Sequence, residues 1–481
     1  MQYPEVIHRG AIGGITGSCH QLQLSATISV LIDCGSFQGA EVGSHRIDNS
    51  LGFPIDTIKA LVVTHVHADH VGRIPSLLAA GFKGPILCSE PSAQLLPLVL
   101  EDAFKFEFGR DEQQLSQYLD LVNTRIIALP FDHWFNLAQN PELSYRVRLR
   151  RAGHILGSAY VEFDVEYPFE QRTKRLVFSG DLGPSHMPFL PSPKSPERAD
   201  LLVLESTYGD RLHEDRSTRI SRLEAVIDKA LADHGTVLIP AFSIGRTQEL
   251  LYEIEDILHR KELNNKLHAA DDGDDSSPIH WPELPVILDS PLASRFTKVY
   301  LELDDFWEGE AKHRSENGRK SLQFNQMITI DSHAKHLQTV NYLASTGRPA
   351  IVIAGHGMCS GGRIVNYLKA MLGDVRNNVL FVGYQVKGTP GSAIQMHGDK
   401  GGYVELDRER YPIRAGVTTI GGYSAHADQK GLVEFVTGMD KSPSEIRLVH
   451  GEASAKKELR KILLRKHELR RIALTIEIPG S

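Results

Sequence analysis

The sequence predicts an α/β protein with more than one domain, and three observations indicate this fold class. The chain has 481 residues, which exceeds one ordinary domain, and 41% of them are hydrophobic, enough to bury a sizeable core. Short apolar runs rich in β-branched residues alternate with longer stretches at helical spacing. Four of these runs end at an acidic residue or a histidine, and convergent strand ends bring such groups to one edge of a sheet. We therefore expect two domains and one shared polar site.

The first expected element is a β-hairpin over residues 10–34, whose second strand runs from Ile28 to Ile32. Asp33 ends that strand beside a glycine turn. Its carboxylate either caps the turn or lies near a metal site, and the residues alone leave both interpretations open.

The next apolar run, Ala60 to Val63, leads into the pattern His-x-His-x-Asp-His. Its polar members are His65, His67, Asp69 and His70. Imidazole suits zinc and similar metals, and the added carboxylate gives enough ligands for more than one ion. The pattern therefore predicts metal binding rather than a solvated loop, and a short helix over residues 71–80 is expected to follow it.

Three later segments place further polar groups at strand ends or turns. His154 lies between two glycines, Asp181 follows the run that ends at Phe178, and Glu205 follows the run that ends at Leu204. Each would be an ordinary turn residue by itself. Together with the strand ends at Asp33 and His65 they favour one shared site.

The middle of the chain predicts a mostly parallel sheet covered on both faces. Continuous apolar runs at 235–242, 285–290, 349–354 and 378–383 alternate with helical stretches, the first of which is expected from Ser243 through Lys261. The acidic segment 266–283 is expected to be a mobile loop. A glycine-rich segment, 355–363, lacks the Gly-Lys-Ser/Thr ending of a P-loop, which argues against an ATP site.

Other conspicuous residues favour structural roles. The four cysteines, which include Cys19 and Cys34, form no Cys-x-x-Cys pair and are expected to be buried free thiols. His333 and His336 have ligand-like spacing on a helix, but no partner motif lies nearby in the sequence. We expect both to be exposed.

The net charge of −7 argues against a uniformly basic nucleic-acid-binding protein, although it leaves a local basic groove open. Two basic segments stand out, 146–151 at strand spacing and 456–471 at helical spacing. For each, a solvated face is favoured over an RNA contact. The expected buried stripe of the second segment consists of Leu459, Ile462, Leu463 and Leu469. No signal-peptide pattern and no apolar run of membrane-spanning length is found, so a cytoplasmic protein without a membrane partner is expected.

The order of these motifs resembles that of the metallo-β-lactamase superfamily. Asp33 in Leu-Ile-Asp-Cys-Gly, the loop from His65 to His70, His154 and Asp181 look like its four successive motifs. The similarity extends over nearly the whole chain. It implies an αββα sandwich with a metal centre at one edge.

Three further motifs resemble those of the β-CASP nucleases within that superfamily. They are Glu205 in Leu-Glu-Ser-Thr-Tyr-Gly, His426 in Tyr-Ser-Ala-His-Ala-Asp and His450 in Val-His-Gly-Glu. The resemblance implies that an α/β β-CASP domain, expected at 209–395, is inserted into the metallo-β-lactamase domain, expected at 1–208 and 396–481.

The resemblance also implies a dinuclear zinc site, in which Mn²⁺ could substitute. The first ion would be held by His65, His67 and His154. The second would be held by Asp69, His70 and His450. Asp181 would bridge the two ions, so that Asp69 and Asp181 also take part in catalysis.

Outside the ligand set, the resemblance implies that His426, oriented by Glu205, protonates the leaving oxygen or hydrogen-bonds the scissile phosphate. Asp33 would support the ligands from behind. Ser360 and Ser424 are candidate phosphate contacts, and tight turn packing is the favoured alternative for the segment around Ser360.

The expected activity is hydrolysis of RNA phosphodiester bonds in RNA processing or decay, by endonucleolytic or exonucleolytic cleavage or both. The expected partner is single-stranded RNA rather than DNA, because RNA-processing members of the family carry the histidine that corresponds to His450. Two alternatives stay open: a hydrolase of a small ester, thioester or lactam, and a catalytically silent RNA-binding subunit. The direction of cleavage, the cellular RNA, the role of His356 and the oligomeric state, with a homodimer among the alternatives, are also left open.

Overall fold

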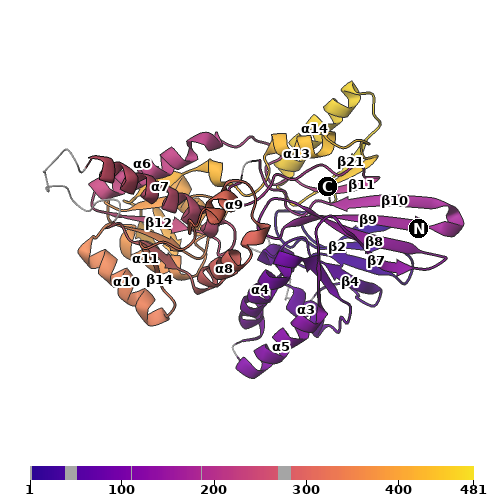
Figure 1. Cartoon of the computed structure of the whole chain (residues 1–481), viewed down its shortest axis with the longest axis horizontal. Helices are drawn as coiled ribbons and strands as arrows, with labels where there is room; N and C mark the ends of the chain where they lie inside the picture. The colour runs from indigo at the N-terminus through magenta and orange to yellow at the C-terminus, as the bar shows by residue number, and fades with distance from the viewer. Residues whose placement is uncertain (1–2, 38–50, 110, 186, 269–282, 481) are drawn as a thin grey trace. The chain divides into compact units, whose positions relative to one another are not determined.

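The computed structural model describes residues 3–37, 51–109, 111–185, 187–268 and 283–480 (Figure 1). It divides into two compact units, the first made of Met1–Leu212 with Ala425–Ser481 and the second of His213–Ser424. The chain therefore leaves the first unit once and returns to complete it. Most of the acidic segment predicted as a mobile loop, residues 269–282, lies outside the described residues.

The first unit contains two sheets. One has the order β1 (Glu5–His8), β2 (His20–Gln23), β3 (Ser29–Ile32), β4 (Ile58–Val62), β5 (Ile86–Ser89) and β6 (Ile126–Leu129). The other has the order β21 (Thr475–Glu477), β20 (Glu445–Val449), β11 (Leu201–Glu205), β10 (Arg172–Phe178), β9 (Ala159–Tyr167), β8 (Ser144–Arg151) and β7 (Trp134–Gln139). Strands β2 and β3 pair in antiparallel fashion, which confirms the predicted N-terminal hairpin.

The core of the first unit lies between these sheets. Side chains from both sheets meet there, among them Val30 and Val62 from one sheet and Val161 and Phe163 from the other, and all four are completely buried. The alternation of inward and outward residues along each strand produces this arrangement. The strands that lead into the His-x-His-x-Asp-His motif are therefore packed against the opposite sheet.

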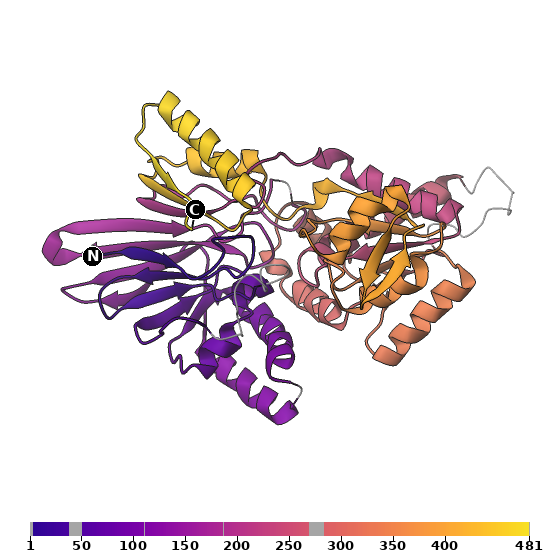
Figure 2. The same ribbon diagram turned by 180° about the vertical axis from the view of Figure 1, so that it is seen from behind.

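Helices cover the outer faces of both sheets, which completes an αββα sandwich, as predicted. The helices α3 (Ile74–Ala79), α4 (Glu90–Phe108) and α5 (Glu112–Arg125) lie on one side (Figure 1). The other side carries α13 (Gln429–Thr437) and α14 (Ala453–Leu469), whose apolar residues pack against β11 and β20 (Figure 2).

Of the residues predicted to form the buried face of α14, those in the middle of the helix are buried or partly buried and the one at its end is not. Leu459 and Leu463 are completely buried against the sheet, but Leu469 is 77% exposed at the last position of the helix. The polar residues Lys456 and His467 are buried instead, because each finds a backbone carbonyl to bond. Helical spacing identified the face but not its ends.

The second unit is built on a parallel sheet with the order β14 (Met327–Thr329), β13 (Val286–Asp289), β15 (Ala350–Ala354), β12 (Thr236–Pro240), β16 (Asn378–Phe381) and β19 (Gly416–Thr419). Every residue of β12 and β15 is buried, so both faces of the sheet are covered, as the continuous apolar runs predicted. The main covering helices are α6 (Arg219–Ala232), α7 (Arg246–His268), α8 (Pro291–Glu302), α10 (His333–Thr346), α11 (Arg363–Met371) and α12 (Pro390–His397). No helix within the described ranges is long and apolar enough to cross a membrane.

The second compact unit extends to residue 424, beyond the boundary expected at 395. Strand β19 pairs with β16 over four residues, and the hairpin of β17 (Tyr403–Leu406) and β18 (Glu409–Pro412) buries Val404 and Leu406 in the core of this unit. Residues 396–424 therefore belong to the second unit by their contacts. The short, partly exposed β19 had no apolar run to reveal it.

Two expectations for residues away from the strand-end motifs have opposite outcomes. All four cysteines are buried and free, as predicted. The expectation that His336 is exposed was wrong, because the residue is completely buried. Its Nδ1 lies 2.7 Å from Oδ2 of Asp289, and its Nε2 lies 2.8 Å from Nδ2 of Asn366. The partner carboxylate ends strand β13, 47 residues earlier in the chain, so helical spacing alone could not identify it.

Candidate metal centre

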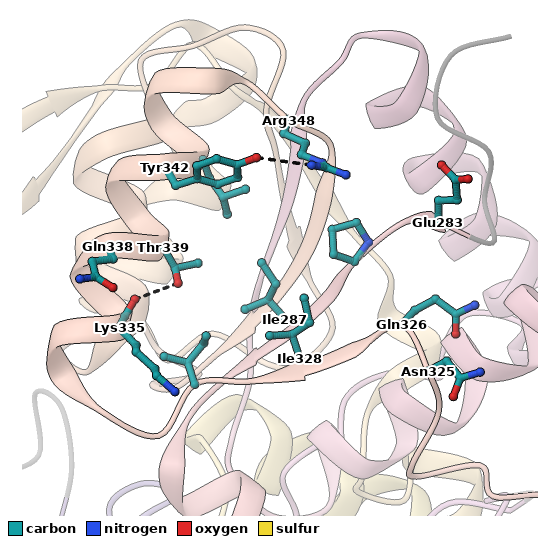
Figure 3. Close-up of a pocket in the computed structure, with 13 residues that line it drawn as sticks. Glu283, Ile287, Asn325, Gln326, Ile328, Lys335, Gln338, Thr339, Tyr342 and Arg348 are labelled. Atoms are coloured by element: carbon teal, nitrogen blue, oxygen red, sulfur yellow. Dashed lines mark hydrogen bonds between the residues drawn. The ribbon is translucent and has the colours of Figure 1, made fainter.

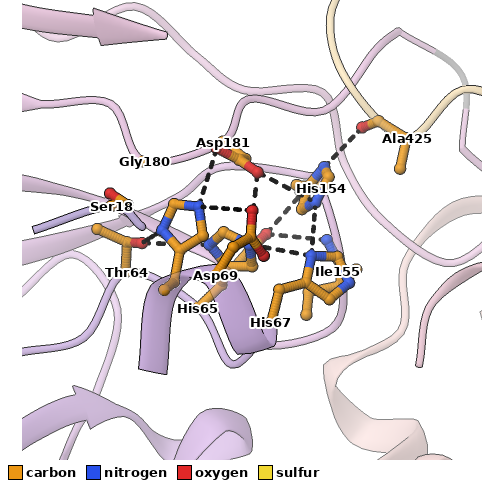
Figure 4. Close-up of polar contacts among 12 residues, drawn as sticks. Ser18, Thr64, His65, His67, Asp69, His154, Ile155, Gly180, Asp181 and Ala425 are labelled. Carbon is orange, nitrogen blue, oxygen red and sulfur yellow. Dashed lines mark hydrogen bonds and ion pairs between the residues drawn. The ribbon is translucent and has the colours of Figure 1, made fainter. Parts of the chain in front are cut away.

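Seven polar side chains converge where the strands of the first unit end. His65 and His67 follow β4, Asp69 and His70 lie in the short helix α2 (Ala68–Val71), and His154 lies in the turn between β8 and β9. Asp181 follows β10, and His450 is the residue after β20. Figure 4 shows the imidazoles of His65, His67 and His154 pointing toward the carboxylate of Asp181. The structure thus brings together every residue that the resemblance implied as a ligand.

Close backbone contacts hold the loops of this cluster together. A Cβ atom at Gly35 would lie 1.5 Å from the carbonyl oxygen of Asp69, and one at Gly183 would lie 1.8 Å from that of Gly153. Glycine is therefore required where the loops of Asp33 and Asp181 touch those of the other ligands. His450 itself has a left-handed backbone, with φ of 48°, a conformation that costs non-glycine residues about 1–3 kcal/mol and clusters at functional sites.

The first group of candidate ligands contains His65, His67, His154 and Asp181. Nδ1 of His67 lies 3.1 Å from Nε2 of His65 and 3.1 Å from Nε2 of His154. Oδ2 of Asp181 lies 3.5 Å from Nε2 of His65 and 3.6 Å from Nε2 of His154. Four ligand atoms from three separate loops therefore surround one point.

The second group contains Asp69, His70 and His450, with Asp181 beside it. Nε2 of His450 lies 3.3 Å from Nε2 of His70 and 3.4 Å from Oδ2 of Asp69. Oδ1 of Asp181 lies 3.3 Å from Nε2 of His70. The two oxygens of Asp181 thus face different groups, as a bridging carboxylate requires.

These donor sets fit zinc. A tetrahedral site with Zn–N bonds of about 2.05 Å has edges of about 3.3 Å, close to the separations between the ligand atoms. Oδ1 of Asp181 is buried and, within the described part of the chain, accepts no hydrogen bond. A buried carboxylate oxygen without such a partner is costly unless a cation compensates for it.

Burial determines the protonation of the first group. It lowers the pKa of His65 and of His154 well below 6.5 and lowers that of His67 to about 4. These imidazoles are therefore neutral at pH 7, which metal ligation requires. In the second group, burial raises the pKa of Asp69, but His450 and His70 together lower it to about 2. That carboxylate is ionised.

Asp33 and Thr64 orient the ligands of the histidine loop. His70 donates from Nδ1 to Oδ2 of Asp33 over 2.7 Å. Thr64 donates from its hydroxyl to the same carboxylate over 2.8 Å, and its Oγ1 lies 3.2 Å from Nδ1 of His65. Because the Thr64 proton is engaged by Asp33, Oγ1 accepts from His65. Both imidazoles are thereby held with Nε2 directed at the cluster.

Equivalent contacts orient the two ligands from the later part of the chain. Nδ1 of His154 lies 2.9 Å from the carbonyl oxygen of Ala425, the first residue of the returning segment. Nδ1 of His450 lies 3.2 Å from Oγ1 of Thr207, whose hydroxyl donates to the carbonyl oxygen of His450 over 3.3 Å. The carbonyl and the Thr207 oxygen act as acceptors, so Nε2 of each histidine is directed at the cluster.

His426 and Glu205 form a pair at the side of the cluster. Nδ1 of His426 lies 3.3 Å from Oε1 of Glu205 and 3.8 Å from Oδ2 of Asp181. Glu205 is 1% exposed and accepts from the backbone N–H groups of Leu182 and Thr207, which fix its orientation. Burial lowers the pKa of His426, but Glu205 and Asp181 outweigh it and raise the value to about 9.

The two candidate phosphate contacts, Ser360 of the glycine-rich segment and Ser424 of the Tyr-Ser-Ala-His motif, belong to the second unit. Ser360 is exposed there, and Ser424 is buried. Nδ1 of His356 accepts from the backbone N–H of Met358 over 3.2 Å. This contact shows a turn-stabilising role for His356. Phosphate binding by the two serines stays a prediction.

Sequence reasoning missed three groups that orient the ligands: Thr64, Thr207 and the carbonyl of Ala425. Thr64 directly precedes His65, and Thr207 lies within the quoted motif two residues after Glu205, so a hydroxyl close to a strand-end histidine or glutamate was an available signal. A backbone carbonyl carries no such signal. Its role follows only from where the returning chain passes His154.

The fold and the ligand set define a class of protein, and comparison with family models agrees with them. The model for the metallo-beta-lactamase superfamily matches residues 22–237, the model for the Beta-Casp domain matches 247–394, and the model for the Zn-dependent metallo-hydrolase RNA specificity domain matches 410–472. The chain belongs to the β-CASP family of the metallo-β-lactamase superfamily.

Two relatives show how far the similarity extends. Ribonuclease TTHA0252 of Thermus thermophilus is 33% identical over 462 residues, which cover 95% of each chain. Transcription termination factor FttA of Methanocaldococcus jannaschii is 28% identical over 451 residues, and the match covers 91% of this chain but 65% of that protein. The chain thus spans slightly less than two thirds of the archaeal relative.

Proposed function

We propose that this protein is a dinuclear zinc-dependent ribonuclease that hydrolyses phosphodiester bonds of single-stranded RNA. One observation carries the proposal: Asp181 belongs to the first group of candidate ligands, its Oδ1 lies 3.3 Å from Nε2 of His70 in the second group, and His426 lies beside the same carboxylate and pairs with Glu205. A phosphodiester is anionic, so its hydrolysis needs charge neutralisation, an activated water and a proton for the leaving oxygen. The cluster has groups suited to each need.

In the proposal, His65, His67, His154 and Asp181 hold one zinc ion, and Asp69, His70, His450 and Asp181 hold the other. Bound zinc would neutralise phosphate charge and supply an activated water at neutral pH, and Mn²⁺ could replace it. Asp33, Thr64 and Thr207 keep the imidazoles oriented. Asp69 and Asp181 would be ionised in this state, because bound cations favour the charged form of the carboxylates that hold them.

His426 has the position of a proton donor. Glu205 engages its Nδ1, so we infer that Nε2 is the atom that reaches the leaving oxygen or the scissile phosphate. The fixed orientation of Glu205 limits rotation of the ring. General acid catalysis of this kind contributes about 10²–10⁴-fold to a rate.

RNA is the proposed substrate for two reasons. The Thermus thermophilus relative, which matches over 95% of each chain, is named a ribonuclease, and the family model that matches residues 410–472 is named an RNA specificity domain. DNA is a weaker candidate. In the second unit, Ser360 and Ser424 remain proposed contacts to substrate phosphates.

The test uses RNA labelled separately at the 5′ and 3′ ends and compares the zinc-loaded wild type with His426→Ala. The wild type is expected to cut RNA faster than single-stranded DNA, and His426→Ala is expected to reduce kcat about 10²–10⁴-fold. The pattern of end-labelled products distinguishes endonucleolytic from exonucleolytic cleavage. The control is His133→Ala, which removes an exposed histidine of the same unit and is expected to leave the rate unchanged.

Metal analysis of the purified protein forms the second part of this test. Two zinc ions per chain, lost in Asp181→Asn, are the expected result. Hydrolysis of a small ester, thioester or lactam without cleavage of RNA would overturn the proposal in favour of a small-molecule hydrolase. RNA binding without zinc or cleavage would favour a silent subunit.

A further inference from the structure

The sequence left two interpretations, a solvated face or an RNA contact, for each of the two basic segments. The structure gives the two segments different surroundings. The arginines of strand β8 pair with carboxylates of the neighbouring strand β9. Arg146 lies 2.9 Å from Asp164, and Arg148 lies 2.5 Å from Glu162. Both guanidinium groups also lie 4.5 Å from the ring centroid of Trp134. These charges are engaged inside the first unit, which supports a structural role for β8.

Helix α14 has a different arrangement. Its buried side presents Ala455, Lys456, Leu459, Leu463 and His467 to the unit. The cations on and just after the helix that are exposed to solvent are Lys457, Arg460, Lys461, Arg465, Lys466, Arg470 and Arg471. Over this segment the acidic residues are Glu458 and Glu468. We call Lys457, Arg460, Lys461 and Arg465 the α14 basic face, because their spacing of three, four and eight residues places them on one side of a helix.

Most of these cations have no carboxylate partner. Of the four that form the α14 basic face, Lys461 pairs with Glu458 at 3.4 Å, and within the described ranges the other three have no acidic group within 4.0 Å. Surface ion pairs normally form where oppositely charged residues are available. Within the described part of the chain, three of the four cations of the α14 basic face are therefore available to an anionic partner from outside a chain of net charge −7.

The position of α14 relates this face to the metal centre. The helix starts at Ala453, three residues after His450, and both belong to the first compact unit. At a rise of 1.5 Å per residue, the basic face runs for about 12 Å from Lys457 to Arg465. A polyanion with one phosphate at the metal centre could thus continue along the helix.

We propose that the α14 basic face binds the phosphate backbone of the RNA chain whose scissile bond lies at the metal centre. This inference rests on the proposed function. It concerns sequence-independent phosphate contacts of one helix face, because exposed Lys and Arg side chains neutralise phosphate groups without reading base edges. Contacts of this kind increase affinity and salt dependence without changing the chemistry.

The experiment measures the RNA affinity of a variant with Lys457→Gln, Arg460→Gln, Lys461→Gln and Arg465→Gln. The matched control neutralises four exposed lysines elsewhere in the same unit, with Lys59→Gln, Lys83→Gln, Lys194→Gln and Lys441→Gln. Both variants change the net charge equally, so a difference between them reports on position. Binding is measured in the His426→Ala background, from 50 to 200 mM salt, so that cleavage does not interfere.

Four lost phosphate contacts are expected to lower the salt slope of binding by about 2.8, at about 0.7 per contact with single strands. Over the same salt range, the wild type should therefore lose about 50-fold more affinity than the α14 variant. The control should retain the wild-type slope. For cleavage, the α14 variant should raise KM and leave kcat unchanged.

Equal slopes for the α14 variant and the control would overturn the inference, and so would binding of anionic phosphatidylglycerol vesicles through α14 with RNA affinity unchanged. Failure of the proposed function has a different signature. In that case the wild type would not cleave RNA at any salt concentration, whether or not α14 contributes to RNA binding.

Discussion

At the residue scale, the centre depends on hydrogen bonds made behind the ligands. Asp33, Thr64, Thr207 and the carbonyl of Ala425 each accept from Nδ1 of a candidate ligand, and Nε2 of that histidine faces the cluster. This determines which nitrogen of each histidine is available to a metal. His67 is the exception, since its Nδ1 faces the neighbouring ligands.

Thr207 offers a selective test of this arrangement. Thr207→Val keeps the shape of the side chain but removes the acceptor for His450, so we expect zinc affinity of the second group to fall about 10–100-fold. Affinity of the first group, which has no contact with Thr207, should stay unchanged. Competition with a chromogenic chelator measures both affinities without RNA.

Thr207→Ser restores the hydroxyl and is the matched control. This substitution should return the zinc affinity of the second group close to the wild-type value. Equal weakening of both groups by Thr207→Val would instead indicate a general structural role, and two unchanged affinities would show that the hydrogen bond is irrelevant to metal binding.

At the element scale, the second unit has a buried charge cluster between α6 and α7. Arg219 of α6 pairs with Glu249 at 2.9 Å and with Glu253, both of α7, while the hydroxyl of Tyr423 donates to Glu253. Burial is the largest influence on Glu253 and raises its pKa to about 7, against the opposing effect of Arg219. The sequence predicted a helix from Ser243 through Lys261 but gave no sign of this cluster, because its members lie up to 204 residues apart.

This raised pKa predicts that the second unit loses stability with rising pH. A carboxyl group whose pKa is higher in the folded chain contributes stability that is complete below about 4.5 and is lost as the pH rises through about 7. Glu253→Gln cannot ionise and should remove most of this dependence. Arg219 would keep Glu249 as its partner.

Thermal unfolding between pH 5 and pH 8, with peptides of the second unit followed by hydrogen exchange, measures the effect. The loss of stability over this range should be smaller in Glu253→Gln than in the wild type by about 1–3 kcal/mol. The matched control is Glu310→Gln, which changes an exposed glutamate of the same unit. Parallel pH profiles for the wild type and Glu253→Gln would contradict the prediction.

At the scale of the whole molecule, the metal centre joins segments that are far apart in the chain. The candidate ligands span residues 65 to 450, and the last of them follows the entire second unit in the sequence. Metal binding should therefore stabilise the first unit as a whole, including the returning segment. The second unit contains none of these ligands.

Removal of metal is expected to destabilise the first unit and to leave the second unit unchanged. Zinc at 1,000 times its dissociation constant stabilises a folded state by about 4 kcal/mol, and a chelator abolishes this contribution. Hydrogen exchange of the chelated protein should therefore increase in peptides from 1–212 and 425–481. Peptides from 213–424 should keep their protection, and equal loss in both units would argue against the assignment of the centre to the first.

The sequence alone predicts the fold class, four of the six strands of the parallel sheet, and the motif residues of the candidate centre. Local periodicity and the order of the motifs contain that information. Only the tertiary structure decided the end of the second unit at residue 424, the buried states of His336 and Lys456, and the roles of Thr207 and Ala425. Each of these depends on a partner far away in the chain, and the position of such a partner is set by packing rather than by local pattern.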